Sequence, residues 1–272
     1  AVPFFSDHTL VEVRGFDLNR CRDADAERLR AMLCDIPDYC TVAFVQPVDY
    51  ELDGRLALVK TLKKQGRVIV FAEQDGAALV RWIARRFEHF GKSISRQDAE
   101  YLIFLCGDLM TGLASEIGKI GSYAQAERVT RQDIDAVAIP ITDAVVFQMT
   151  EALTQQRYDR AFAVYGDLLR LRQEPIMILA VRGKHLRQLY TARLALELRR
   201  DSRWLMELWG MRSTYPADKL MDMARRHGLD WCRTAMRRCA ETDLAMKSVA
   251  GADPNDLLVS LMLELAAGGR AC

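Results

Sequence analysis

The pattern of hydrophobic and polar positions changes character near Asp75. Before that residue, short runs rich in β-branched side chains alternate with segments whose apolar residues recur at helical spacing. The predicted strands are 9–16, 41–46 and 68–72, and the predicted helices between them are 23–33 and 54–65. Strands that alternate with helices predict a parallel sheet, and three strands make only part of a doubly wound one.

Beyond Asp75 the apolar positions recur every three or four residues and no strand is predicted. The predicted helices are 77–90, 96–106 and 109–123, and the pattern then stays helical from about Pro140 to the end. Pro175 and Pro254 stand where the first turns of two long helices would begin. The fold class is therefore mostly α with an N-terminal α/β part, in three predicted domains: 1–75, 76–139 and a helical bundle over 140–272.

The stretch Gly91-Lys92-Ser93 matches the end of a phosphate-binding loop, which needs a glycine five residues before Gly91 and a preceding strand. Arg86 occupies that glycine position, and the residues before Gly91 follow a helical pattern. We therefore interpret Gly91 as a helix C-cap and Ser95 as the next N-cap, with Asp98 completing a short capping box. No nucleotide or metal is expected at this stretch.

Composition indicates a globular chain with enough apolar residues for sizeable cores. Half the residues are hydrophobic, and 38 basic residues nearly balance 37 acidic ones. These proportions exclude a disordered or collagen-like polymer. No apolar run is long and uncharged enough to predict a membrane span or a secretory signal.

Cysteine and histidine positions predict no metal centre or disulfide framework. There are seven cysteines and no Cys-x-x-Cys pair. Cys21, Cys34 and Cys40 with His8 are spaced too irregularly for a zinc site, so buried thiols in a reducing compartment are the better interpretation. The four histidines have no acidic or cysteine partner at a regular spacing, and we expect each to be a surface or packed residue.

The end of the strand at 41–46 bears on ATPase chemistry. A nucleotide-binding ATPase of the AAA+ type holds Mg²⁺ with an acidic pair directly after a strand. Here the chain continues through Gln46, Pro47 and Val48 before it reaches Asp49. We predict an ATPase-shaped α/β domain without ATPase chemistry, and neither a cofactor nor a metal.

Four further segments matter for their order along the chain. They are Pro3-Phe4-Phe5-Ser6 before the first strand, "GDLMTGLASEIGKIGSY" (107–123), "RLRQEPIMILAVRGKHLRQLY" (170–190) and "ETDLAMKS" (241–248). In this order they resemble the delta subunit family of the bacterial DNA polymerase III clamp loader. The resemblance implies an incomplete, degenerate AAA+-like parallel-sheet domain, a small helical lid and a helical collar that oligomerises, over the three residue ranges given above. Family members carry further residues upstream of Ala1, so it also implies an N-terminally truncated sequence.

The resemblance implies a function as well. A delta subunit binds the sliding clamp and opens it for loading on primed DNA, while partner ATPase subunits, joined through the collar, hydrolyse ATP. It is non-catalytic by itself, is part of a DNA-directed DNA polymerase holoenzyme, and works in the cytoplasm without a membrane. The family's clamp-binding hydrophobic pair precedes a strand, which assigns clamp binding to Pro3, Phe4 and Phe5.

Other interpretations stay open at this point. The chain could be a fragment of a true AAA+ ATPase or helicase loader, or a helical adaptor, and Phe4 and Phe5 could pack on their own domain. Glu116 and Lys119 form an i,i+3 pair to which we assign no chemistry. Basic clusters occur at Lys60/Lys63/Lys64/Arg67, Arg81/Arg85/Arg86 and Arg182/Lys184/Arg187, and we interpret each as a solvated face.

Overall fold

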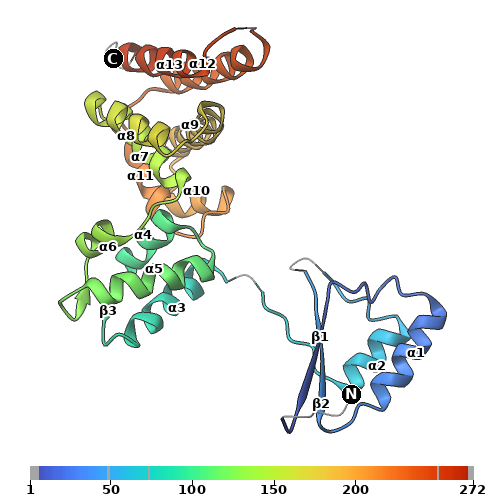
Figure 1. Ribbon diagram of the computed structural model, residues 1–272. Helices are drawn as coiled ribbons and strands as arrows, with labels where there is room; N and C mark the ends of the chain where they lie inside the picture. The colour runs from blue at the N-terminus through green and yellow to red at the C-terminus, as the bar shows by residue number, and fades with distance from the viewer. Residues whose placement is uncertain (1–5, 48–49, 73, 250, 269–272) are drawn as a thin grey trace. The chain divides into compact units, whose positions relative to one another are not determined.

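The chain folds into two compact units, Ala1–Glu73 and Gln74–Cys272, which are described separately. The computed structural model describes residues 6–47, 50–72, 74–249 and 251–268 (Figure 1). The candidate residues Pro3, Phe4 and Phe5 lie outside these described residues.

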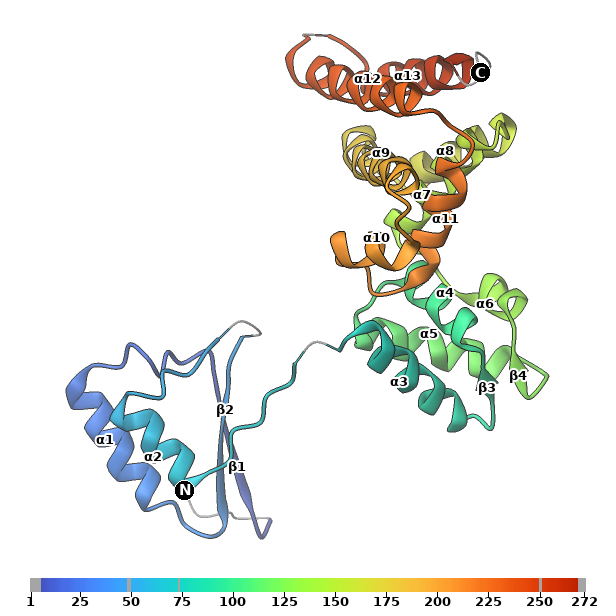
Figure 2. The ribbon, with the colours of Figure 1, turned by 180° about the vertical axis from the view of Figure 1, so that it is seen from behind.

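The first unit is a small α/β sandwich. Strands β1 (Thr9–Arg14) and β2 (Cys40–Val45) pair in parallel, with Thr9 opposite Cys40. Helices α1 (Asp23–Cys34) and α2 (Ala57–Gln65) lie side by side on one face of this sheet (Figures 1 and 2). Leu18, Leu33 and Leu58 are the buried centre of the core between sheet and helices, and the predicted parallel arrangement is confirmed.

The third strand predicted at 68–72 is wrong. Residues 67–72 are extended chain outside any sheet, and the described part of this unit has two strands. Val70 and Phe71 are 79% and 91% exposed. A β-branched run becomes a strand only where a neighbouring backbone accepts its hydrogen bonds, and sequence periodicity does not report that neighbour.

The second unit begins with four helices around one core: α3 (Gly76–Glu88), α4 (Arg96–Cys106), α5 (Met110–Tyr123) and α6 (Arg131–Val137). Leu79, Ile83, Leu102 and Ile117 are among its buried residues. The helices predicted here are confirmed. The structure adds a short parallel pair, β3 (Ser93–Ile94) with β4 (Arg128–Val129), whose strands are too short to leave a periodic signal.

The predicted N-cap at Ser95 is confirmed, but Asp98 does not complete a capping box, because its carboxylate accepts from the Ser95 hydroxyl rather than from the Ser95 backbone N–H. The Ser95 hydroxyl accepts a hydrogen bond from the backbone N–H of Asp98 at the start of α4. At the start of α6, Thr130 and Asp133 form a complete capping box. Glu116 pairs with Lys119 at 2.8 Å, as expected for an i,i+3 contact.

Seven further helices follow within the described residues 138–249 and 251–268. They are α7 (Thr142–Thr154), α8 (Tyr158–Arg170), α9 (Pro175–Glu197), α10 (Ser202–Leu208), α11 (Thr214–Ala224), α12 (Leu229–Ser248) and α13 (Pro254–Gly268). The long helix predicted to start at Pro175 is confirmed, with the proline in its first turn. Helix α12 packs along α9 and α13, as Figure 2 shows.

Aromatic side chains join the two sets of helices within the second unit. The Phe104 ring of α4 lies 5.2 Å from the Phe147 ring of α7 and 5.0 Å from the Tyr215 ring of α11. Beside them, the Ser213 hydroxyl donates to the Glu100 carbonyl at 3.0 Å. Helices α3–α6 and α7–α13 therefore share a packed junction, and their division into lid and collar domains stays a prediction.

No single helix in the described part of the chain is long and apolar enough to cross a membrane. Two bent helix pairs reach that length and apolarity together, α4 with α5 and α6 with α7, and they bend by 119° and 116°.

Candidate functional site

The candidate clamp-binding residues Pro3, Phe4 and Phe5 are followed in the chain by residues that hydrogen bonds and β1 hold in place. Ser6 and Asp7 are exposed, and the Ser6 hydroxyl donates to the His8 carbonyl at 2.8 Å. The Thr9 N–H then donates to the Tyr39 carbonyl at 2.7 Å, which starts the pairing of β1 with β2. Whatever Pro3, Phe4 and Phe5 contact, the chain directly after them is held by the sheet.

An apolar groove lies close by, between the sheet and α1. Its volume is about 390 Å³. Val11 and Val13 of β1 and Val42 and Phe44 of β2 form one wall, and Met32 of α1 contributes to the other. The groove is an apolar surface that this unit offers to an aromatic side chain of its own or of a partner.

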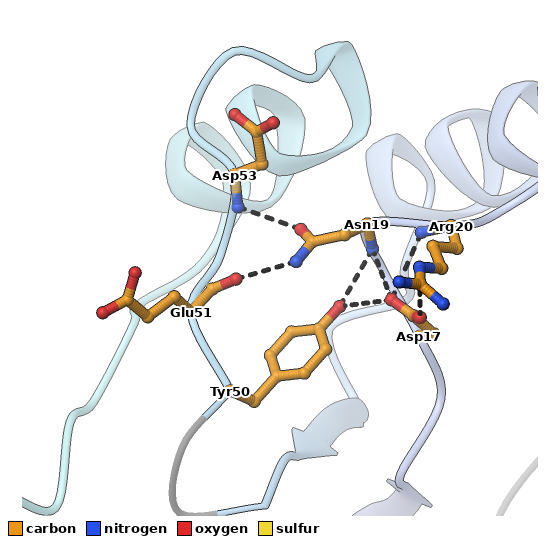
Figure 3. A network of polar contacts seen from close by, with 6 residues as sticks. All are labelled: Asp17, Asn19, Arg20, Tyr50, Glu51 and Asp53. Atoms are coloured by element: carbon orange, nitrogen blue, oxygen red, sulfur yellow. Dashed lines mark hydrogen bonds and ion pairs between the residues drawn. The ribbon is translucent and has the colours of Figure 1, made fainter.

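A network of polar contacts fills the carboxyl edge of the sheet, where open α/β sheets usually bind ligands (Figure 3). The Tyr50 hydroxyl donates to Asp17 at 2.8 Å. The Asn19 side chain bridges the two loops, because it donates to the Glu51 carbonyl at 2.7 Å and accepts from the Asp53 N–H at 2.9 Å. Side chains thus tie the loop after β1 to the loop after β2.

The pKa shifts of the side chains at this edge indicate a structural role for them rather than a role in proton transfer. The hydrogen bond from Tyr50 lowers the pKa of Asp17, while burial and the same bond raise the pKa of Tyr50. Hydrogen bonds from Arg55 lower the pKa of Asp53 to about 2. Neither carboxylate is placed to act as a general acid or base near neutral pH. Among the described residues, no group of three or more metal-binding side chains comes together.

Gly91, Lys92 and Ser93 close a helix instead of forming a phosphate loop. Gly91 takes the left-handed conformation (φ 64°), and its N–H and that of Lys92 donate to carbonyls in the last turn of α3. The Lys92 ammonium donates to the carbonyls of Gln125 and Ala126 at 3.3 and 2.8 Å. The interpretation of Gly91 as a C-cap is confirmed.

Replacing Lys92 by alanine tests this assignment. We expect a loss of about 0.5–1.5 kcal/mol in the free energy of unfolding, since two carbonyls lose a donor. Any affinity for ATP should be the same as in the unchanged chain. Urea denaturation and calorimetric titration with ATP measure the two quantities, and Lys63→Ala, on an exposed helix position, is the control. An ATP affinity that Lys92→Ala abolishes would restore the phosphate-loop interpretation.

The basic cluster on α9 is only partly solvated, which corrects the expectation for it: Arg187 is exposed, but Arg182 is buried and Lys184 is half-buried in an ion pair. Arg182 is 1% exposed. Lys184 and His185 both contact Asp143 of α7, at 2.6 and 2.9 Å. Sequence spacing could not find these pairs, because Asp143 lies 42 residues before His185. The remaining basic clusters include exposed residues such as Lys60 and Arg85, in line with a solvated face.

The pKa shifts of two packed histidines determine how the free energy of unfolding should depend on pH. Burial lowers the pKa of His185, which its bond to Asp143 opposes, and burial lowers the pKa of His227, which stacks on Trp231. In the unfolded chain both histidines bind protons near pH 6.5. The folded state binds fewer, so stability should be full above about pH 6.5 and fall as the pH decreases below it.

Urea midpoints between about pH 7.5 and 5.5 measure this dependence. The variant His227→Phe should flatten the fall, because it removes one of the two groups whose protonation favours the unfolded chain. The variant His89→Gln, at an exposed position, should leave the slope unchanged. An equally steep fall in His227→Phe would show that this histidine is not responsible.

Comparisons with known proteins now give the family. Residues 1–72 match the family profile described as DNA polymerase III, delta subunit, and residues 143–265 match that of the DNA polymerase III delta subunit, C-terminal domain. The DNA polymerase III subunit delta of Bacillus subtilis (strain 168) is 22% identical over 222 residues, 81% of this chain and 63% of that protein. The chain thus spans less than two thirds of that relative's length.

A solved structure agrees in fold. The Bacillus subtilis DNA clamp loader delta protein superposes with a TM-score of 0.59 over 97% of this chain and 79% of that one, at 20% identity. The predicted fold class, mostly helical with a partial parallel sheet near the N-terminus, is confirmed. The chain belongs to the DNA polymerase III delta subunit family.

Proposed function

We propose that this chain is a clamp-loader subunit that binds the sliding clamp and opens it for loading on primed DNA. The observation that carries the proposal is the match of two separate regions, 1–72 and 143–265, to two parts of the same family in the family's order. The relative whose structure is similar is named as a DNA clamp loader delta protein.

The proposed clamp contact is Pro3-Phe4-Phe5. These residues form an apolar stretch directly before the exposed, polar Ser6 and Asp7, and the sheet fixes the chain from Thr9 onward. Two aromatic rings on a short polar stem have the chemistry of an interface anchor, which enters a preformed apolar pocket on a partner. Support for the assignment comes from the family's motif at this place and from this fixed base.

The subunit is proposed to have no ATPase chemistry of its own. Gln46 follows β2 where an acidic pair would hold Mg²⁺, and its amide donates to the Phe16 carbonyl at 2.8 Å. ATP bound by partner subunits would then expose the clamp-binding segment, and the clamp would be captured in its open form because that form is bound more tightly. The chain works within a polymerase holoenzyme, without an active site of its own.

The partners we propose are the sliding clamp, the ATPase subunits of the loader through a collar over 140–272, and primed DNA within the assembled complex. The lid would cover 76–139 and the incomplete AAA+-like domain 1–75. Family members serve bacterial DNA replication, so we place the protein in the cytoplasm.

Capture of the clamp tests the proposal. The full chain is immobilised, and the purified sliding clamp of the same organism is passed over it with and without ATP. We expect saturable binding that does not need ATP, and no ATP hydrolysis by the chain alone. Hydrolysis by the chain without clamp binding would instead favour a true AAA+ ATPase.

A further inference from the structure

A polar cleft of about 710 Å³ lies at the junction of the two sets of helices in the second unit. Helices α4, α6, α7 and α11 and the start of α8 line it, so residues far apart in the sequence face one space. Its volume is typical of small-molecule sites. Nothing in the proposed clamp contact uses this cleft.

The planar guanidinium group of Arg131 lines the cleft and is held by two tyrosines. The Arg131 guanidinium lies over the Tyr101 ring, 3.8 Å from its centroid, and donates to the Tyr215 hydroxyl at 2.6 Å. Tyr101 is 4% exposed and donates to Asp135, so the platform under the guanidinium is fixed. The Arg131 side chain is itself 48% exposed and lines the cleft. Guanidinium planes held in this way stack well on nucleic-acid bases.

The charges of the cleft are unevenly compensated. Asp135 faces Arg131 at 3.9 Å, and Glu151 pairs with Lys219 at 2.9 Å. Arg157 and Arg160 also line the cleft, are exposed, and form no ion pair with any carboxylate of the described residues. Two guanidinium groups that line the cleft are therefore left for an anionic ligand.

We propose that this cleft binds one nucleotide unit, with its base stacked on Arg131 and its phosphate held by Arg157 and Arg160. A single pair of uncompensated arginines fits one phosphate group, whereas a duplex backbone needs a longer cationic track. The flat platform favours a ring-bearing phosphate over an acidic peptide. A free nucleotide and a nucleotide within a single strand share this chemistry, and the test distinguishes them.

Calorimetric titration of the full chain with dAMP, with inorganic phosphate and with a short single-stranded oligo(dA) tests the proposal. We expect saturable binding of dAMP that inorganic phosphate competes away. The double variant Arg157→Gln/Arg160→Gln should weaken dAMP at least tenfold. Arg131→Lys keeps the charge but removes the plane, so it should weaken dAMP severalfold and leave phosphate binding unchanged.

The matched control is Arg170→Gln/Arg172→Gln, at the last residue of α8 and just after it, which removes the same charge away from the cleft. It should bind dAMP as the unchanged chain does, and urea midpoints check that every variant is folded. If oligo(dA) binds much more tightly than dAMP, with a salt dependence of only about one or two phosphates, the natural ligand is single-stranded DNA. If it does not, the ligand is a free nucleotide.

Three results would overturn the proposal. The first is the absence of saturable binding of both dAMP and oligo(dA). The second is an equal loss in the matched control, which would indicate non-specific attraction to positive charge. The third is tight binding of an acidic peptide by the cleft arginines with no nucleotide binding. None of these results bears on the clamp, so the proposed function stands or falls separately.

Discussion

Replacing Phe4 and Phe5 by alanine should weaken binding of this chain to the sliding clamp by about 3–6 kcal/mol, because each buried ring contributes about 1.5–3 kcal/mol and losses concentrate in a few anchors. The free energy of unfolding should be nearly unchanged, since an anchor must be free to enter its partner. Surface plasmon resonance measures the first quantity and urea denaturation the second. Phe71→Ala is the matched control, because that ring is 91% exposed in the same unit.

The two measurements have to be read together. A large fall in stability with unchanged clamp binding would assign the rings to their own domain. The apolar groove between the sheet and α1, lined by Val13 and Phe44, would be the surface that receives them. Equal losses of clamp binding in Phe71→Ala and in the double variant would show that Phe4 and Phe5 are not a specific anchor.

Replacing Arg182 by methionine should raise the free energy of unfolding by about 1–4 kcal/mol, the range found when buried ion pairs are replaced by well-packed apolar side chains. Its Nε and Nη1 atoms are buried without a hydrogen-bond partner. Burial lowers the pKa of Arg182 to about 10, the direction expected when a cation loses hydration. The unfolded chain hydrates this charge freely, so the charge opposes folding.

Urea denaturation measures the free energy of unfolding of Arg182→Met, and two further variants serve as controls. Arg182→Lys keeps a buried cation and should not stabilise the chain, and Arg187→Met changes an exposed position of the same helix and should be nearly neutral. If Arg182→Met instead destabilises the chain by several kcal/mol, the guanidinium must contribute favourable interactions that outweigh its desolvation.

Features that depend on neighbouring residues in the sequence could be predicted well. The cap at Ser95, the C-cap at Gly91 and the start of α9 at Pro175 each follow from local backbone chemistry. The parallel pairing of β1 and β2 followed from strands that alternate with helices.

Other features that depend on distant residues could not be predicted. The run at Val68–Phe71 has strand propensity, but it could form a strand only beside a pairing partner, which the sequence pattern does not report. Arg182 belongs to a charge-rich stretch and yet is buried, because the packing of α9 against α12 decides its exposure. The Tyr101–Arg131–Tyr215 stack joins three helices, and no spacing within one segment indicates it.

The prediction of the candidate site depended on a family resemblance rather than on the chemistry of its residues. Pro3, Phe4 and Phe5 carry no acid, base or metal ligand, so only the motif's place before a strand pointed to them. The family is now shown by two matching regions. The roles of the three residues stay a prediction.

Clamp opening can be measured directly as release of the sliding clamp from circular DNA in the absence of ATP. A subunit that binds the open ring more tightly than the closed ring must shift the clamp toward the open form. We expect this chain to accelerate release, and Phe4→Ala/Phe5→Ala to remove the acceleration. Saturable clamp binding by the chain without any change in the release rate would contradict its proposed role in opening the clamp.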